Sequence, residues 1–323
     1  MILTLTANPS LDRTVTLGSA LVPGQVHRIS QDVTQPGGKG VNVALGVHRG
    51  GAEVTALLPA SPEDPLVGLL TEAELPFRLS PLTGRVRTNL TVVGSDGVTT
   101  KINEPGPQLG GEEGAALEDL VSGALSAGDL LMLSGSLAPG LPQDLYARLV
   151  HRARSVGAWV GIDTSDAALA RVVEQLGTTA PDMLKPNAHE LGQILGVDGD
   201  ALERSAAAGD LGPVQRAATR LHALGVREVL VTLGSAGAVL VTAEGAWWAR
   251  TADVPVRSTV GAGDSATAGY LLARSRGSDP SERLALATSY GAAAVTLQGT
   301  TIPDPDQAAA HPAQVQPLPS SAF

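Results

Sequence analysis

The sequence predicts an α/β fold: a mostly parallel β-sheet covered by helices on both faces, with a small antiparallel β lid. Short apolar or β-branched runs alternate with Ala- and Leu-rich segments of helical length, which is typical of parallel sheets. Two further regions show polar/apolar alternation of period two with no helix between, and this favours antiparallel strands.

The expected elements of the body follow from this alternation in chain order. The short apolar runs expected as strands are Ile2–Ala7, Val54–Leu58, Leu130–Ser134, Trp159–Asp163, Met183–Leu184, Glu228–Leu233 and Ala238–Val241. The segments expected as helices are Gly40–Arg49, Gly111–Leu125, Pro142–Ser155, Val214–Leu224, Ala262–Arg274 and Ser281–Val295. The tail from Pro303 is rich in Pro and Ala, with one short helix expected near Asp306–His311. Because no repeat or linker divides the chain, we expect a single domain over residues 1–323.

The lid is expected from residues 11–33 and 87–102. Thr88–Val93 alternates polar and apolar residues, and the SDGV sequence at Ser95–Val98 is a hairpin turn signal. Two such insertions in an α/β body suggest a lid over a cleft. A strand pair that packs against another subunit is compatible with the same pattern.

Composition excludes several classes of function. The net charge is −10 and no run of Lys or Arg occurs, so nucleic acid is not an expected partner. Zero cysteines exclude disulfides and thiolate metal sites, and the six histidines have no metal-ligand spacing. The first residues lack the pattern of a signal peptide and no apolar stretch approaches membrane-spanning length, so we expect a cytoplasmic protein without a membrane partner.

Lysine is scarce, and its placement is informative. Only three of the 22 basic residues are Lys: Lys39, Lys101 and Lys185. Each stands beside Gly, Pro or Asn in a loop-like segment, which suggests that a compact point charge is needed there. Chance placement on solvated loops is the alternative.

The segment STVGAGDSATAGY at 258–270 combines an anion site with an acid. The amides of Gly261, Ala262 and Gly263 begin a helix, where free N–H groups attract phosphate. Asp264 follows directly, and a carboxylate beside a moving phosphoryl group can accept the proton of an attacking hydroxyl. The alternative is that Asp264 complements the helix dipole. Neither a GxxxxGK[ST] phosphate loop nor a GxGxxG dinucleotide fingerprint is present.

The PGGKGVNVALGVHRGG segment at 36–51 offers groups suited to a phosphorylated polyol. Gly38 permits close backbone approach, Lys39 adds a cation, and Asn42 can read hydroxyl groups, as can Asp12 just after the first strand. Arg87 and Lys101, on paired lid strands, can converge on an acceptor's phosphate. A flexible glycine turn and a solvated lid surface are the respective alternatives.

KPNAHEL at 185–191 and VTLGSAGAVL at 231–240 suit the nucleotide side. Lys185 can reach phosphates, while Asn187 and Glu190 share one helix face and can hold Mg²⁺ through water. A helix cap formed by the same two residues is the alternative. Gly234 and Gly237 permit close approach to a nucleotide, or form an ordinary hairpin.

Six motifs together resemble the ribokinase-like (PfkB) carbohydrate kinases in order and spacing: NPSLD, GGKGVNVA, SGSLAPG, KPNAHE, VTLGSAG and TVGAGDS. The resemblance covers residues 1 to about 300, TVGAGDS is very specific, and GGKGVNVA with GRVRTNLTV is most similar to the sugar-phosphate kinases of the family. It implies a three-layer α/β/α sandwich with a β lid that often mediates dimers.

The resemblance also implies a role for each matching residue. Asp264 matches the catalytic base, and Gly261, Ala262 and Gly263 match the anion hole. Asn187 and Glu190 match the Mg²⁺ motif, and the positions on the ATP side are Lys185, Thr232, Gly234 and Gly237. Positions that contact sugar hydroxyls are Asp12, Gly38 and Asn42, and those near the acceptor phosphate are Lys39, Arg87 and Lys101. The chain departs from the family in the lid, where His27 and Arg28 replace the usual pattern.

The implied activity is transfer of the γ-phosphoryl group of ATP, with Mg²⁺, to a ketohexose phosphate. D-Fructose 1-phosphate is the expected acceptor, giving fructose 1,6-bisphosphate. Tagatose 6-phosphate and fructose 6-phosphate are the alternatives within the family, and a sugar-phosphate-binding regulator without catalysis is the alternative from another class. A requirement for a monovalent cation such as K⁺ and a homodimer through the lid stay open.

Overall fold

A twisted ten-stranded sheet forms the centre of the computed structural model, which describes residues 1–319. Within these residues its strand order is β14-β13-β12-β11-β10-β9-β8-β1-β4-β5. In chain order the strands are β1 (Ile2–Thr6), β4 (Val54–Pro59), β5 (Phe77–Ser80), β8 (Leu130–Ser134), β9 (Trp159–Asp163), β10 (Met183–Leu184), β11 (Glu228–Thr232), β12 (Ala238–Thr242), β13 (Gly245–Arg250) and β14 (Gln314–Pro317). Neighbours from β5 to β11 pair in parallel, and β12 to β14 continue the sheet antiparallel.

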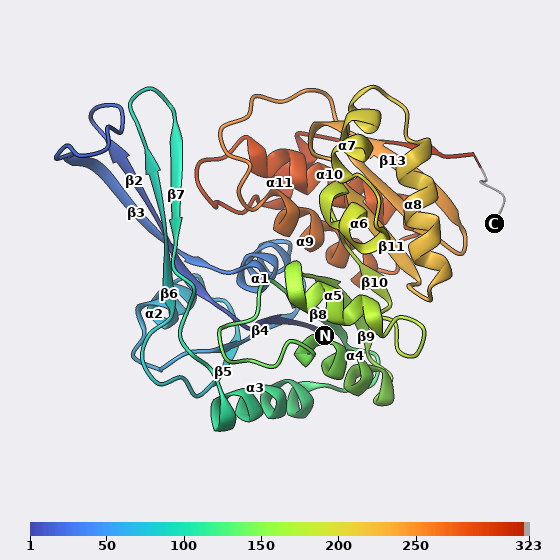
Figure 1. Cartoon of the computed structure of the whole chain (residues 1–323), viewed down its shortest axis with the longest axis horizontal. Coiled ribbons are helices and arrows are strands. Elements are labelled where there is room, and N and C mark those ends of the chain that lie inside the picture. Colours follow the sequence, from blue (N-terminus) through green and yellow to red (C-terminus); the bar gives the residue numbers. More distant parts are fainter. Residues whose placement is uncertain (320–323) are drawn as a thin grey trace.

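Helices lie on both faces of this sheet (Figure 1). In chain order they are α1 (Lys39–Arg49), α2 (Pro65–Glu72), α3 (Gly111–Ala124), α4 (Leu145–Ser155), α5 (Asp166–Glu174), α6 (Ala188–Leu195), α7 (Gly199–Ala207), α8 (Gly212–Ala223), α9 (Ala262–Ser275), α10 (Pro280–Val295) and α11 (Pro305–Ala309). Of the described helices, none is long and apolar enough to cross a bilayer.

Alternate residues of the strands build the two cores. On β11, Leu230 packs with Tyr270 and Leu284 of α9 and α10, whereas its neighbours Val229 and Val231 belong to the cluster on the other face, which includes residues of α8. This burial on both sides explains why these strands read as continuous apolar runs rather than as alternating ones.

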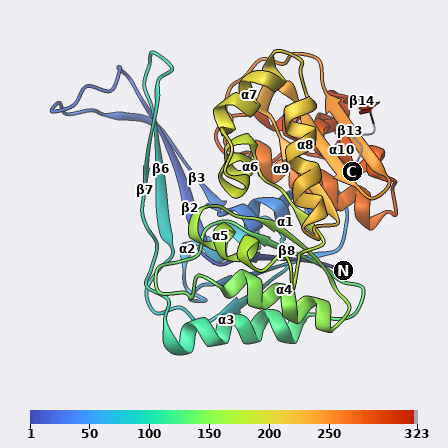
Figure 2. The ribbon, with the colours of Figure 1, turned by 45° about the vertical axis from the view of Figure 1, so that its right-hand side comes forward.

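A second, four-stranded sheet forms the lid, in the order β3-β2-β6-β7. Its strands are β2 (Ser10–Leu17), β3 (Ile29–Gly37), β6 (Arg87–Val93) and β7 (Thr99–Asn103). Figures 1 and 2 show it rising beside the body, with its far end away from the helices. The β2–β3 and β6–β7 pairs are antiparallel, as expected, but β2 and β6, which come from separate excursions of the chain, pair in parallel.

The α/β/α architecture with a lid is confirmed, and the predicted strands of the body all form. The sequence reading missed three strands, β5, β13 and β14, and the helices α2, α5 and α7. Gly245–Arg250 reads GAWWAR, an apolar run with two strand-favouring Trp shortly after β12, so the signal for β13 was present in the sequence and was overlooked.

Candidate active site

The residues predicted for the site, except Lys101, meet at the carboxyl ends of the parallel strands, where open α/β sheets bind ligands. A cavity of about 350 Å³ there is lined by Asp12, Gly38, Lys39, Asn42, Arg87, Asn89, Asp163, Lys185, Asn187, Glu190, Thr232, Val260, Gly261, Gly263 and Asp264. A second cavity, of about 820 Å³, shares Thr232 and Gly263 with the first. Two adjoining cavities with common residues provide separate places for a donor and an acceptor.

The start of α9 has the geometry expected of the predicted anion hole. Gly261 precedes the helix with φ +80°, a conformation that favours glycine, and no side chain caps the first turn. The first N–H groups are therefore available to an anion. The ammonium of Lys185 lies beside them, 3.5 Å from the position that a Cβ would take on Gly263. Helix amides and a cation thus converge on one point.

Asp264 is buried directly behind this point, with 7% of its surface exposed. Asn42 of α1 donates a hydrogen bond from Nδ2 to Asp264 Oδ2 at 2.8 Å, which fixes the carboxylate. Burial raises the pKa of Asp264 to about 6, and the negative charge of Asp163 acts in the same direction. Lys39, Lys185 and the Asn42 hydrogen bond oppose the rise. Such a group is ionised at neutral pH and is more basic than an ordinary aspartate, which suits a general base.

Asp163 at the end of β9 holds the two lysines of the site. Its Oδ1 pairs with Lys39 Nζ and its Oδ2 with Lys185 Nζ, each at 2.9 Å, and its side chain is 1% exposed. Burial by itself raises the pKa of Asp163, but the two ammonium groups outweigh it and hold the pKa below its ordinary value. The same pairing raises the pKa of Lys39. One buried carboxylate therefore fixes the positions of both lysine side chains in the site.

Asn187 and Glu190 form the cap of α6. Asn187 Oδ1 accepts from the Glu190 N–H at 2.8 Å, and Glu190 Oε2 accepts from the Asn187 N–H at 2.9 Å, a complete capping box. The capping alternative is therefore correct as geometry. It leaves the Glu190 Oε1 atom free of a role in the cap, and both residues line the cavity.

The second cavity lies over β11, β12 and α10. Thr232, Gly234, Gly237 and Ala262 line it, and its wall includes the apolar side chains of Val254, Val256 and Val295. Gly237 has φ +90°, and a Cβ there would lie 2.0 Å from Ala249 O, so only glycine permits this turn. A mostly apolar slot next to the anion hole suits a nucleoside, whose phosphates would extend toward Gly263.

Lid residues close the smaller cavity on its other side. Asn89 Nδ2 donates to Asp12 Oδ1 at 3.0 Å and to Ser10 Oγ at 3.1 Å, which ties β6 to β2. Arg87 has a buried Nε without a partner among the described residues. Burial lowers the pKa of Arg87, partly offset by Asp12, yet a guanidinium stays charged. A half-buried cation with an unused buried donor is suited to an anionic group of the acceptor.

One lid prediction, that for Lys101, needs correction, and the structure also places His27 and Arg28, whose role the sequence left open. Lys101 is exposed on β7 opposite Thr91, four residues from Arg87 along β6, so it does not line the cavity. Four residues of strand span about 13 Å, which keeps the two cations apart within one chain. His27 bonds to Val22 and Ser19 at the tip of the β2–β3 connection, next to the exposed Arg28, and neither lines the cavity.

Asp163 and Asn89 are site residues that the sequence reading missed. Asp163 ends a predicted parallel strand, where side chains meet ligands, and this position was the available signal. Asn89 lies on a lid strand that was recognised, but only the register with Asp12 brings it to the cleft.

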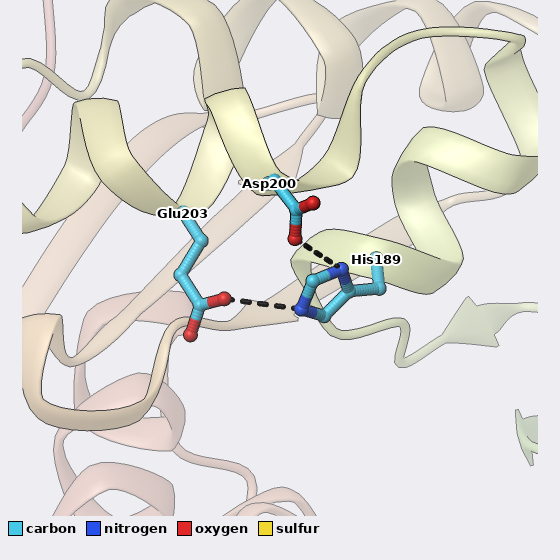
Figure 3. Close-up of side chains that lie close together, drawn as sticks. All are labelled: His189, Asp200 and Glu203. Atoms are coloured by element: carbon cyan, nitrogen blue, oxygen red, sulfur yellow. Dashed lines mark ion pairs between the residues drawn. The ribbon is translucent and has the colours of Figure 1, made fainter.

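His189 forms a small exposed cluster with Asp200 and Glu203 (Figure 3), and none of the three lines either cavity. Its Nδ1 lies 3.3 Å from Asp200 Oδ1 and its Nε2 lies 3.1 Å from Glu203 Oε2. The pairs join α6 to α7, and all three side chains are more than half exposed. We interpret them as surface ion pairs between the two helices.

The fold and this site define a phosphotransferase whose acceptor is an alcohol. The chain belongs to the pfkB family of carbohydrate kinases, whose model matches residues 6–307. It is 36% identical to a 1-phosphofructokinase of Xanthomonas campestris, over 84% of this chain and 83% of that protein. It is also 36% identical to a 1-phosphofructokinase of Rhodobacter capsulatus, over 96% and 95%. In fold it resembles phosphofructokinase-2 from Escherichia coli, crystallised with substrates and products, at a TM-score of 0.85 and 28% identity over 96% of this chain and 97% of that one.

Proposed function

We propose that this kinase transfers the γ-phosphoryl group of ATP to the 6-hydroxyl of D-fructose 1-phosphate, giving fructose 1,6-bisphosphate. Asp264 carries the proposal: a buried, ionised carboxylate lies at the mouth of an anion hole, and a pure binding protein has no use for such a base. Two relatives that are 36% identical to this chain are named 1-phosphofructokinase, and this favours fructose 1-phosphate as the acceptor.

The site residues divide the work of the transfer between them. The acceptor hydroxyl gives its proton to Asp264 as its oxygen attacks the γ-phosphorus, and the bond to the ADP oxygen breaks. The amides of Gly261, Ala262 and Gly263, with Lys185, stabilise charge on the transferred group. Thr232, Gly234 and Gly237 position the nucleotide. Asp163 pairs with Lys39 and Lys185 and so orients the first toward the acceptor and the second toward the transferred phosphoryl group.

The acceptor is held by groups from the lid and α1. Asp12, Asn42 and the backbone at Gly38 contact its hydroxyls, while Lys39 and Arg87 attract its phosphate. Gly38 has φ +98°, and a Cβ there would lie 2.6 Å from Thr6 Cγ2, so the turn that brings the backbone to the sugar depends on glycine.

The residues present fit Mg²⁺, which takes oxygen ligands and keeps several waters. Glu190, supported by its cap with Asn187, would hold the ion on the phosphate side of the cleft, chiefly through water. The ion would supply charge neutralisation on the phosphates of ATP. We leave a role for K⁺ to direct measurement of rates with and without the cation.

A homodimer through the lid belongs to the same proposal. Large apolar side chains are exposed on the lid, among them Val26 (89%), Ile29 (50%), Val98 (59%) and Ile102 (57%). An unbacked sheet with such a surface is suited to a protein partner. Light scattering after gel filtration tests it: a dimer mass that Ile102→Asp reduces to the monomer supports the lid interface, and a wild-type monomer contradicts it.

Initial rates of ADP release test the acceptor. With Mg-ATP, we expect kcat/KM for fructose 1-phosphate to exceed that for fructose 6-phosphate, tagatose 6-phosphate and ribose. Preference for another sugar phosphate would preserve the mechanism and overturn the substrate. Sugar-phosphate binding without turnover would instead support the non-catalytic regulator.

A further inference from the structure

The loop that follows α10 contacts both the lid and the start of the anion hole. Thr300 donates a hydrogen bond from Oγ1 to Gln35 Oε1 on β3 at 3.1 Å, and Gln35 Nε2 donates to Thr301 Oγ1 at 3.4 Å. We propose that Gln35 and Thr300 are positioning residues, which set the lid, and with it the acceptor, relative to the anion hole. This inference rests on the proposed function, because the acceptor is the group that the lid positions.

On the lid side, Gln35 belongs to the strand that builds the acceptor site. It lies directly opposite Asp12 in the β2–β3 register, so the two side chains share one face of the lid. Two residues later, the position of a Cβ on Gly37 lies 2.4 Å from Asp12 Oδ1. The strand then runs through Gly38 into Lys39. A shift of Gln35 therefore shifts the groups that contact the acceptor.

On the body side, the loop is anchored next to the anion hole. Ile302 is 3% exposed, and Arg49 of α1 donates a hydrogen bond to its carbonyl. A Cβ on Gly261 would lie 3.7 Å from Ile302 Cδ1 and 3.9 Å from Thr300 O. The loop thus packs against Gly261, the first residue of the anion hole. Because Ile302 is buried and bonded to Arg49, the part of the loop that contacts the lid is held in place on the body.

These contacts matter because the transfer depends on placement. A hydroxyl must lie close to the phosphorus and in line with it, and displacements of about 1 Å reduce rates strongly. The lid must also exclude water, which competes as an acceptor. Loss of the Gln35–Thr300 contact is expected to lower kcat/KM for the sugar phosphate by about two- to tenfold, the range for one neutral hydrogen bond.

Thr300→Val tests the contact, because valine keeps the shape and lacks the donor. We expect reduced kcat/KM for the sugar phosphate and more ADP released per sugar phosphorylated, with KM for ATP changed less than twofold. Thr300→Ser keeps the hydroxyl and should restore both values. Gln35→Leu also removes the donor to Thr301 Oγ1, so its effect should be at least that of Thr300→Val, and the double variant should be no worse than Gln35→Leu alone. Thr296→Val, at the end of α10 and without a lid contact, is the matched control.

Hydrogen–deuterium exchange of the protein without substrates gives an independent readout. Thr300→Val is expected to raise exchange in residues 29–37 and 298–302, and unchanged exchange in both segments would overturn the contact. If exchange rises but kcat/KM and the ADP released per sugar phosphorylated stay at their wild-type values, the positioning role is overturned. A wild-type chain that phosphorylates none of the sugars would contradict the proposed function instead, and the exchange data would still decide the contact.

Discussion

Replacement of the buried carboxylate by an amide, Asp264→Asn, is expected to abolish most of the activity and to stabilise the fold. Asparagine has nearly the same shape, and its carbonyl oxygen can accept the hydrogen bond from Asn42 that Asp264 Oδ2 accepts at 2.8 Å. It cannot take a proton from the acceptor hydroxyl. Because general-base catalysis contributes about 10²- to 10⁴-fold, kcat should fall by a factor in that range.

The gain in stability follows from the pKa of Asp264. The folded-state pKa of about 6 lies above the ordinary value of 3.8 for an aspartate, so folding disfavours the ionised form. The difference corresponds to about 3 kcal/mol of unfolding free energy, absent at pH below 3.8 and fully present as a penalty above pH 6. At pH 7 the asparagine variant escapes the penalty, and Tm should rise by a few degrees.

Steady-state kinetics and thermal unfolding at pH 7 measure both effects, with direct binding of the sugar phosphate as the control for an intact site. Near wild-type kcat would refute the assignment of the base. A lower Tm would refute the argument that burial and the charge of Asp163 destabilise the ionised form of Asp264.

Four further outcomes are expected from the geometry. In the pH profile of kcat, the acid limb should fall about tenfold per pH unit below pH 6, and a limb near pH 4 would contradict the raised pKa of Asp264. Gly263→Ala adds a methyl to the wall that both cavities share, in ordinary contact with Lys185 Nζ at 3.5 Å, where it takes space from the transferred group; kcat should drop at least tenfold while Tm holds or rises, and unchanged kcat would remove Gly263 from the anion hole. Asp163→Asn leaves the buried Lys185 unpaired and should lower the unfolding free energy by about 3 kcal/mol in denaturant titration, with partial recovery in Asp163→Asn/Lys185→Met. Arg87→Gln should raise KM for the sugar phosphate at least tenfold, whereas Arg85→Gln on the exposed surface should leave it unchanged; equal effects would contradict the assigned phosphate contact.

The body was predictable because local pattern and tertiary environment agree there. Buried parallel strands such as β8 and β9 are short, apolar and separated by helices, and only one arrangement satisfies that pattern. The glycine-rich turns were informative for a related reason. Gly261 and Gly237 adopt positive φ, which few residues other than glycine reach without strain.

The rest depends on register and on contacts across long sequence distances. Asp163 lies 124 residues from Lys39, and nothing local marks it as the residue that pairs with both lysines. The separation of Arg87 from Lys101 follows from the β6–β7 register, which hydrophobic alternation alone does not fix. The Gln35–Thr300 contact joins residues 265 positions apart and was likewise invisible in the sequence.

Phosphorus NMR of the reaction mixture tests the central claim most directly. With Mg-ATP and fructose 1-phosphate, the account predicts a product with two phosphomonoester signals, those of fructose 1,6-bisphosphate, formed in equal amount to ADP. Release of inorganic phosphate alone, or no loss of ATP, would contradict transfer to the sugar by the cleft around Asp264.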